Sequence, residues 1–259
     1  MTESTHEIIA VTDKNVGEYD LFCLKSKHKE QGYKNKVTWF REQFTKGLRI
    51  KLLRVYEGEK RGFSSRGFIE YVPGKHTWRG IEAERWMVIH CLWVVGRNKG
   101  KGYGSQLLRE CILDAEKMDG VAVVTSEENW LPKKNLFIKH GFEKADEIPP
   151  FELYVKRLSE TVPLPRFKSI SKERLKRYGE GLVVVKSHQC PYAHGLTKTV
   201  EEMAEKAHIP VRIKHLSYCK DAQESGHPYG TFFVVLDGRV ISYYPGDLTE
   251  VKKALTEKS

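Results

Sequence analysis

Residues 92–105, LWVVGRNKGKGYGS, run from an apolar strand through a glycine-rich loop into a helix. Glycine stands at every second position of the loop, at Gly100, Gly102 and Gly104. Because glycine has no Cβ, the main-chain N–H groups of such a loop can converge on an anion. The N-terminus of the following helix adds unpaired donors and a partial positive charge. The stretch therefore predicts a site that binds a pyrophosphate group.

Two common pyrophosphate-binding loops have a different pattern. A dinucleotide-binding loop has the spacing GxGxxG and an acidic residue about twenty positions later, whereas the glycines here follow GxGxG. A Walker loop needs Gly-Lys-Ser/Thr after a longer spacer, and Gly100-Lys101-Gly102 does not provide it. A glycine-rich turn that only caps an ordinary helix is the remaining structural alternative.

The loop is similar to the coenzyme A loop of the GNAT acyltransferases, whose pattern is Arg/Gln-x-x-Gly-x-Gly/Ala. Lys99 stands where that family usually has Arg or Gln, and a lysine keeps the charge but lacks the planar fork of a guanidinium. The resemblance implies acetyl-CoA as a cosubstrate. It also implies the residues that would contact it: Leu92, Trp93, Val94, Lys99, Gly100, Lys101, Gly102, Tyr103, Gly104, Ser105, Asn135 and Phe137.

The composition limits the class of protein. A length of 259 residues is sufficient for two domains. The chain has no run of apolar residues long enough for a membrane span, and its first residues lack the pattern of a secretion signal. The five cysteines are scattered without the spacing of metal ligands. We therefore expect a cytoplasmic protein without a metal ion or a membrane partner.

The net charge of +10 is spread along the chain. Residues 159–259 carry 16 basic and 12 acidic side chains, so both halves contribute to the excess. A nucleic-acid-binding protein more often concentrates its basic residues on one face or tail. Nucleic acid is therefore a weak alternative partner, and the charge is better explained by solubility and by attraction for an anionic cosubstrate.

Residues 159–180 contain two prolines, six basic residues and little apolar periodicity, which is typical of a linker. This segment separates a domain at 1–158 from a smaller one at 181–259. The patterns in the first domain predict its elements in this order: strand 7–11, helices 16–27 and 36–46, strands 49–56, 66–72 and 82–95, a helix ending near 117, strand 121–125, helix 131–139, and strands 142–146 and 151–157.

This order resembles a whole GNAT domain over about residues 5–157. Residues 135–142, NLFIKHGF, are similar to the penultimate helix of that fold and the Gly-Phe pair that follows it. The resemblance implies an α+β fold with a mixed, mostly antiparallel sheet flanked by helices.

Transfer of an acyl group from a thioester to an amine needs a deprotonated amine and donors for the developing oxyanion. The resemblance places the thioester where strand 92–95 separates from strand 121–125, with the Val94 N–H as the oxyanion donor. Strand alternation places Glu84 and His90 toward the cleft unless a bulge intervenes, so they are candidate general bases acting through water. A solvated Glu84 and a hydrogen-bonded core His90 are the alternatives.

Phe137 occupies the position at which the family usually has a tyrosine that protonates the leaving thiolate. Tyr103, Tyr154 or solvent remain as proton donors. Because the CoA thiolate is a good leaving group, the absence of this acid would slow the reaction without preventing it.

The second domain resembles the thioredoxin-like α/β fold. Its predicted order is a strand at 181–187, a helix after Cys190, strand 211–216, a hairpin of strands 232–236 and 240–244, and a helix at 248–255. The resemblance places Cys190 at the attacking cysteine and implies a cis bond before Pro228. The two modules in this order resemble the YoaP-type acetyltransferases.

Cys190 lies at the start of a helix, where the dipole stabilises a thiolate. The motif is Cys-Pro-Tyr-Ala, so Ala193 replaces the second cysteine of C-x-x-C. Cys219 could form a disulfide with Cys190 only if the fold brings their Cα atoms within about 7 Å. A thiol that contacts substrates and a redox-inactive module for docking or dimerisation both remain open.

The combined features predict an acetyl-CoA-dependent N-acetyltransferase that acts on an amine, preferably a small molecule, by direct attack on the thioester. The alternative from another class is a CoA-binding regulatory or scaffold protein with a thiol-contacting module. A homo-oligomer is compatible with either prediction. Several aromatic residues could line the acceptor pocket or belong to the core: Trp39, Phe40, Trp78, Trp86 and Trp130.

Overall fold

The computed structural model of the chain describes residues 6–128, 130–170, 172–243 and 248–257. Its first domain is built on a seven-stranded sheet. The strands are β1 (His6–Val11), β2 (Arg49–Tyr56), β3 (Phe63–Pro73), β5 (Trp86–Val94), β6 (Gly120–Thr125), β7 (Glu143–Ile148) and β8 (Phe151–Arg157). Their order across the sheet is β1-β2-β3-β5-β6-β8-β7. Neighbours are antiparallel except β5 and β6, which are parallel. The expected mixed, mostly antiparallel α+β fold is present.

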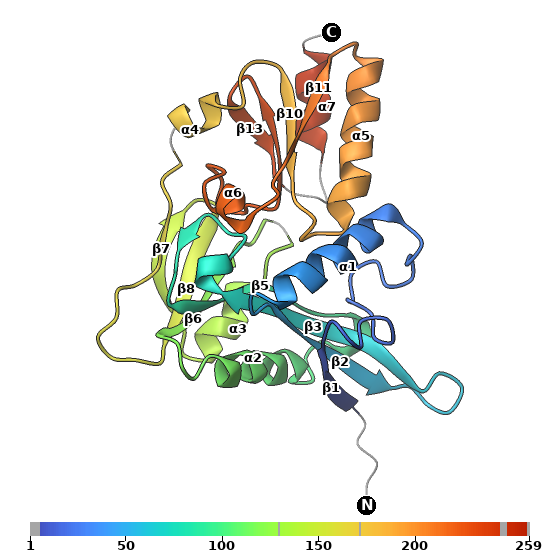
Figure 1. Cartoon of the computed structure of the whole chain (residues 1–259), viewed down its shortest axis with the longest axis vertical. Helices are drawn as coiled ribbons and strands as arrows, with labels where there is room; N and C mark the ends of the chain where they lie inside the picture. Colours follow the sequence, from blue (N-terminus) through green and yellow to red (C-terminus); the bar gives the residue numbers. More distant parts are fainter. Residues whose placement is uncertain (1–5, 129, 171, 244–247, 258–259) are drawn as a thin grey trace, which may run out of the picture.

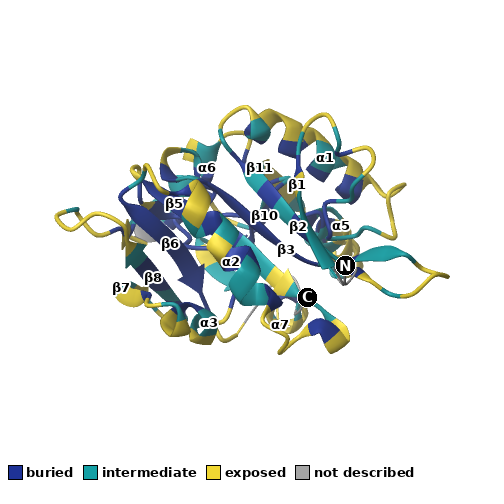
Figure 2. Ribbon diagram, turned by 90° about the horizontal axis from the view of Figure 1, so that it is seen from below, coloured by how far each residue is buried: buried dark blue, intermediate teal, exposed yellow. Residues whose placement is uncertain are grey.

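Helices cover both faces of this sheet. They are α1 (Gln31–Phe44), α2 (Tyr103–Asp114) and α3 (Lys134–Lys139). Figure 1 shows α1 on one face and α2 and α3 on the other, and Figure 2 shows α2 crossing the face opposite α1. The apolar side of α2 carries Leu107, Leu108 and Cys111, which are fully buried against the sheet. Short elements complete this domain: η1 (Gly74–His76), β4 (Ile81–Glu82) and η2 (Gly96–Asn98).

Two predicted elements of the first domain differ from the structure. Residues 16–27, expected as a helix, form a series of turns, in which Phe22 and Leu24 have positive φ angles that no helix allows. The strand expected over 82–95 is interrupted between β4 and β5, because Trp86 N–H donates to the Ala83 carbonyl in a tight turn. Gly141, which follows α3, has a φ of 76°, the left-handed conformation in which many helices end.

β5 contains a bulge, and the assignment of faces from the sequence depended on there being none. The register between β3 and β5 shifts so that His90 is one additional residue on β5. Beyond His90, the alternation of side chains between the two faces of the sheet is therefore shifted by one residue. Ile89 and Leu92 both face α2, although they are three positions apart, and Cys91 faces α1.

The second domain is a four-stranded sheet with helices on both faces. Its strands are β10 (Leu182–Lys186), β11 (Val211–His215), β12 (Phe232–Leu236) and β13 (Arg239–Ser242), in the order β11-β10-β12-β13. β10 is parallel to β11 and antiparallel to β12, and β12 is antiparallel to β13. The helices are α4 (Lys172–Lys176), α5 (Tyr192–Lys206), α6 (Cys219–Gln223) and α7 (Thr249–Thr256).

The helices divide between the two faces of this sheet. α5 and α7 pack on the face that carries Val184, and α4 and α6 pack on the face that carries Phe233. Among the described residues the only cis peptide bond joins Pro149 and Pro150. The bond before Pro228 is therefore trans, so the expectation of a cis bond there is wrong.

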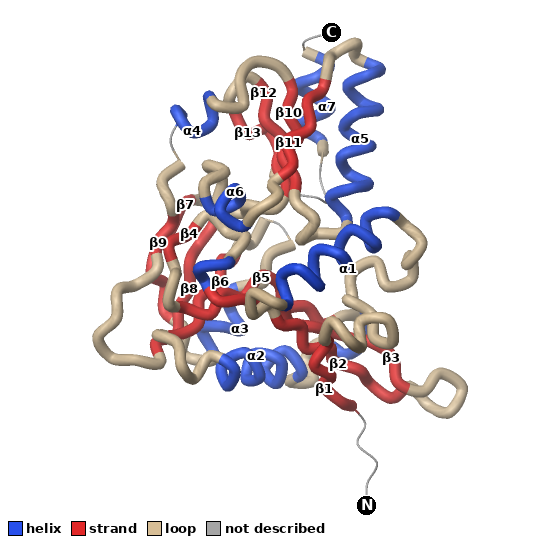
Figure 3. Tube along the Cα trace, viewed as in Figure 1, coloured by secondary structure: helices blue, strands red, loops and turns tan. Residues whose placement is uncertain are grey.

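The segment 159–180 packs against both domains instead of crossing solvent. It contains β9 (Arg166–Phe167), which pairs with β4 of the first domain, and α4, which leads to the second sheet. Leu175 and Tyr178 are buried in the hydrophobic core. Figure 3 shows α6 between the two sheets, where Gln223 donates to the carbonyls of Lys75 and Thr77.

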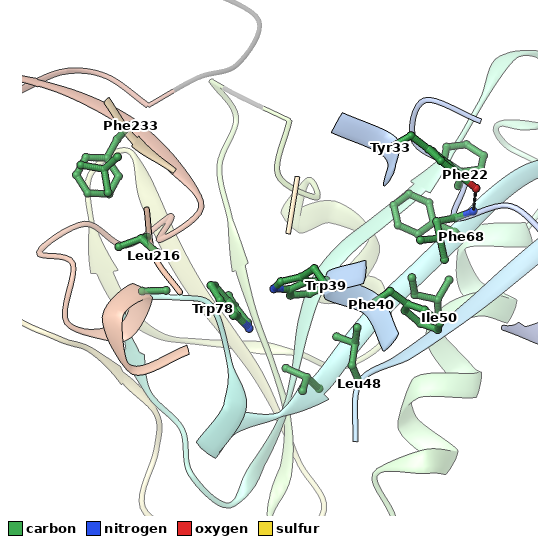
Figure 4. Packing of buried hydrophobic residues seen from close by; sticks show 14 of the residues in the cluster. Phe22, Tyr33, Trp39, Phe40, Leu48, Ile50, Phe68, Trp78, Leu216 and Phe233 are labelled. Atoms are coloured by element: carbon green, nitrogen blue, oxygen red, sulfur yellow. Dashed lines mark hydrogen bonds between the residues drawn. The ribbon is translucent and has the colours of Figure 1, made fainter. Parts of the chain in front are cut away.

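One hydrophobic cluster continues from the first domain into the second. Figure 4 shows it running from Phe40 through Trp39 and Trp78 to Leu216 and Phe233. The rings of Trp39 and Trp78 meet edge to face at 5.5 Å. The two modules are therefore joined by a continuous apolar core, which fixes the surfaces that face each other across it.

Candidate active site

The glycine loop is exposed and its backbone conformation requires glycine. Gly100 and Gly102 have φ angles of 78° and 80°, and a Cβ added to either would meet nothing within 4 Å. Gly102 is the N-cap of α2. Within the described chain, none of the amides from Gly100 to Ser105 donates to a protein acceptor. The loop therefore presents unpaired donors to solvent at a helix N-terminus, as an anion site requires.

The residues around the loop hold its conformation. Ser105 Oγ lies 2.8 Å from His140 Nε2, and the Tyr103 ring packs against His6 with centroids 4.9 Å apart. Lys99 and Lys101 are exposed, and Lys99 Nζ lies 5.7 Å from the centre of the Trp93 ring. Two exposed cations thus flank the unpaired amides.

β5 and β6 separate beside this loop. Their parallel pairing ends at Ile89 and Val123, whereas both strands continue beyond it. The Val95 N–H donates to the Arg66 carbonyl on the β3 side. Because successive N–H groups of a strand point to opposite edges, the Val94 N–H points toward the gap between β5 and β6. The structure thus contains the separation of strands that the resemblance implied.

A pocket of about 350 Å³ lies on the α1 side of this gap, between the two domains. Three of its lining residues, Cys91, Leu92 and Trp93, belong to β5, and Tyr229 precedes β12 of the second domain. The other lining residues are Leu21, Phe22, Cys23, Lys36, Phe68, Glu70, Val95, Trp130, Leu131, Gln189, Cys190, Pro191 and Tyr192. The walls are mostly apolar and aromatic, and both domains are needed to form them.

A buried polar network forms one side of the pocket, centred on Glu70 in β3. The Glu70 carboxylate accepts from Lys36 Nζ at 2.5 Å, His90 Nδ1 at 3.2 Å and Gln189 Nε2 at 2.8 Å. Gln189 in turn accepts from Thr231 Oγ1. Burial alone would raise the pKa of Glu70, but the Lys36 ammonium and the His90 ring outweigh it and lower the pKa to about 2. Glu70 is therefore a carboxylate that is ionised at neutral pH and accepts hydrogen bonds from three donors.

His90 is a fully buried histidine with a partner at each ring nitrogen. Its Nε2 accepts from the Trp78 N–H at 3.0 Å, so Nδ1 carries the proton and donates to Glu70. Desolvation lowers the pKa of His90 to about 4. The structure therefore corrects the assignment of His90 as a general base: its ring holds Glu70 in position and offers no lone pair to a substrate.

Glu84 lies at the wrong end of β5 for a catalytic base. It is exposed in the turn before the strand, whereas Val94 is the last residue of the strand. Nine residues of extended chain separate the two ends by roughly 30 Å. The assignment of Glu84 as a general base is corrected for this reason: Glu84 is a solvated charge beside the start of the strand.

α3, the helix before Gly141, does not place the side chain of Phe137 in the gap between β5 and β6. Phe137 is fully buried, and its ring packs against Phe142 in the core on the α2 side. Its side chain is therefore inaccessible to a ligand, contrary to its expected contact with the cosubstrate. Asn135 is exposed on α3, and the neighbouring Leu136 lies against Gly104.

Cys190 lines the pocket beside Cys91 and Cys23. Burial raises the pKa of its thiol, although the backbone amides of Tyr192 and Ala193 act in the opposite direction. Desolvation thus outweighs the local donors at this helix start, which favours the neutral thiol over the thiolate. Cys219 lies outside this pocket, with its sulfur 3.9 Å from the Lys75 carbonyl, and all five cysteines are free.

Sequence reasoning missed three polar residues of this site: Lys36, Glu70 and Gln189. Glu70 gave the best available signal, since a carboxylate within the apolar strand FIEYV needs a buried partner. The partners themselves lie 34 and 119 positions away, where no local pattern points to them. Of the aromatic candidates, Trp130 lines the pocket and four are buried in the cores: Trp39, Phe40, Trp78 and Trp86.

Within the described ranges, no helix is both long and apolar enough to span a bilayer. The same residues contain no group of three or more His, Cys, Asp or Glu side chains arranged to hold a metal ion.

Comparison with known proteins reveals a relative over nearly the whole chain. The uncharacterised N-acetyltransferase YoaP of Bacillus subtilis is 30% identical over 254 residues, which cover 95% of this chain and 97% of YoaP. The chain belongs to the N-acetyltransferase family of YoaP. It is an acyltransferase. No protein-family model matches the chain.

Solved acetyltransferases resemble part of the chain at low similarity. YhbS of Escherichia coli, a GNAT-family N-acetyltransferase solved with CoA, is 18% identical, with a TM-score of 0.40, and the match covers 63% of this chain and 90% of YhbS. Ard1 of Thermoplasma volcanium is 15% identical, with a TM-score of 0.41, and the match covers 61% of this chain and all of Ard1.

Proposed function

We propose that this acetyltransferase transfers an acetyl group from acetyl-CoA directly to the amine of a small molecule. Val94 carries the proposal, because its N–H points into the gap beside a loop of unpaired amides. The loop from Lys99 to Ser105 would hold the pyrophosphate, with Lys99 and Lys101 as additional cations. The backbone N–H and C=O groups of Leu92, Trp93 and Val94 would form hydrogen bonds with the pantetheine amides, as they would with a neighbouring strand.

The residues of this chain would act on the reaction in three ways. The Val94 N–H would donate to the thioester carbonyl oxygen as charge develops there. The apolar pocket would favour the neutral, nucleophilic form of the amine over its ammonium form, with its proton released to solvent. Cys190 would contact the acceptor through its neutral thiol.

The domain assignment belongs to the same proposal. Residues 1–158 would bind acetyl-CoA, 159–180 would connect the domains, and 181–259 would form a thioredoxin-like module that completes the acceptor pocket. The sheet order β11-β10-β12-β13, with one parallel pair and two antiparallel pairs, supports the thioredoxin-like assignment.

The test measures the release of free CoA from acetyl-CoA in the presence of each amine of a panel. The wild type is compared with Val94→Pro and Val94→Ala. Proline removes only the N–H that faces the gap and no hydrogen bond to β3, whereas alanine retains this N–H. We expect Val94→Pro to lower kcat by about 10²–10³-fold and Val94→Ala to stay near the wild type. Equal kcat in the two variants would exclude Val94 as the oxyanion donor. Acetyl-CoA binding without CoA release for every amine would contradict transfer to a small amine.

A further inference from the structure

The pocket between the domains has a composition that restricts the acceptor. Phe22 and Phe68 stack on one side with ring centroids 4.8 Å apart, and Trp130 meets Tyr192 edge to face at 5.2 Å on another. Tyr229 comes from the second domain. A volume of about 350 Å³ accommodates a group of one or two aromatic rings with its amine.

The charges that reach the described walls of this pocket are already paired. They are Lys36 and Glu70, which are 3% and 1% exposed and lie 2.5 Å apart. Glu70 also accepts from His90 and Gln189, so three donors occupy its two oxygens. No carboxylate among the described lining residues remains to pair with a second ammonium group of a ligand.

The loop that carries Phe22 is held in an unfavourable backbone conformation. Phe22 and Leu24 have φ angles of 66° and 56°, and such angles in residues other than glycine persist only where the surroundings impose them. Here the surroundings are contacts on both sides: Phe22 N–H donates to Asp20, and Lys25 Nζ donates to the Ser65 carbonyl. These contacts hold Phe22 and Cys23 in the wall of the pocket despite the cost of the backbone conformation.

We propose that the acceptor is a primary amine attached to an apolar group of aromatic size and carrying no second charge. This inference rests on the proposed acetyl transfer and names the class of its substrate. The apolar group occupies the space between Phe22, Trp130 and Tyr229, and the amine points toward the gap beside Trp93. Polyamines and aminoglycosides are excluded, because each would bury an additional ammonium group without a carboxylate partner.

The experiment compares kcat/KM for phenethylamine and tryptamine with that for spermidine and kanamycin. We expect the aromatic amines to be at least about 100-fold better, since this ratio corresponds to about 2.7 kcal/mol and the burial of an unpaired charge costs more than that. A higher kcat/KM for spermidine or kanamycin overturns this inference and leaves the proposed transfer intact. The absence of acetylation of every amine overturns the proposed transfer itself.

A matched pair of substitutions locates the acceptor. Cys190→Met extends a side chain into the pocket, whereas Cys219→Met makes the same change outside it. We expect Cys190→Met to raise the KM for phenethylamine at least about tenfold without changing the Kd for acetyl-CoA, and Cys219→Met to change neither. Equal KM values in both variants would place the acceptor elsewhere.

A measurement on the wild-type chain covers the case in which the variants do not fold. Phenethylamine should slow the alkylation of Cys190 by N-ethylmaleimide at alkaline pH, and spermidine at the same concentration should not. Peptide mapping by mass spectrometry identifies the labelled cysteine. Equal labelling of Cys190 with and without phenethylamine overturns the assignment of the pocket.

Discussion

Gln189 donates a hydrogen bond to the Glu70 carboxylate at 2.8 Å, although the two residues belong to different domains and are 119 positions apart. The second domain thereby supplies one of the three donors of a carboxylate buried in the first sheet. The same segment, with Cys190 and Pro191, forms a wall of the pocket. Both domains of this acetyltransferase therefore contribute residues to the same pocket.

The charge cluster predicts how the chain responds to loss of Glu70. Glu70→Ala leaves the Lys36 ammonium buried without its partner, and we expect a loss of about 3–5 kcal/mol in the free energy of unfolding. The double substitution Lys36→Met with Glu70→Gln removes both charges and should cost clearly less than Glu70→Ala alone. Urea unfolding monitored by circular dichroism measures both. A double variant as unstable as Glu70→Ala would contradict the role of the unpaired charge.

His90 predicts a pH dependence of stability. Its pKa is about 4 in the folded chain and 6.5 ordinarily, so the unfolded chain binds more protons between these values. The folded state therefore loses stability as the pH falls from about 6.5 to 4, with a slope of up to about 1.4 kcal/mol per pH unit from this group. Below pH 4.5, the lowered pKa of Glu70 extends the loss toward about pH 2.

Unfolding free energies of His90→Gln at several pH values check this window. The substitution should reduce the slope between pH 6.5 and 4, whatever its effect on stability at neutral pH. His28→Gln, at an exposed histidine, controls for the substitution itself. An unchanged slope in His90→Gln would mean that another group carries the pH dependence.

The glycine loop gives the most direct test of acetyl-CoA binding. Gly102→Glu places a bulky anion where the pyrophosphate would lie and forces a side chain into a φ of 80°. We expect the affinity for acetyl-CoA to fall at least about 100-fold, or about 2.7 kcal/mol, in calorimetry. Gly58→Glu is the matched control, since Gly58 also has a positive φ, of 88°, and open space around it, but lies in another turn. Unchanged affinity in Gly102→Glu would show that this loop is not the binding site.

The thiol at Cys190 should react slowly. Burial raises its pKa, and only the thiolate is nucleophilic, so iodoacetamide at pH 7 should label it more slowly than it labels N-acetylcysteine. Peptide mapping over time gives the rate, with Cys190→Ser to assign the peptide. Rapid labelling at pH 6 would instead indicate a low-pKa thiol of the redox-active type.

The sequence by itself determined the parts of this protein that depend on local chemistry. The glycine spacing from Gly100 to Gly104 specified the exposed loop and the start of α2, because backbone conformation and helix termini are properties of neighbouring residues. The apolar patterns likewise predicted most strands of both sheets. The resemblance to GNAT proteins was carried by these same local features.

Only the tertiary structure decided which side chains meet. The bulge at His90 reversed the faces of β5 beyond it, and the partners of Glu70 came from α1, from β5 and from the second domain. Turns replaced the helix expected over 16–27 because packing against Phe68 and Ser65 imposes positive φ angles on Phe22 and Leu24. Such contacts join residues that are distant along the chain, and their energies depend on burial, which no local pattern of residues contains.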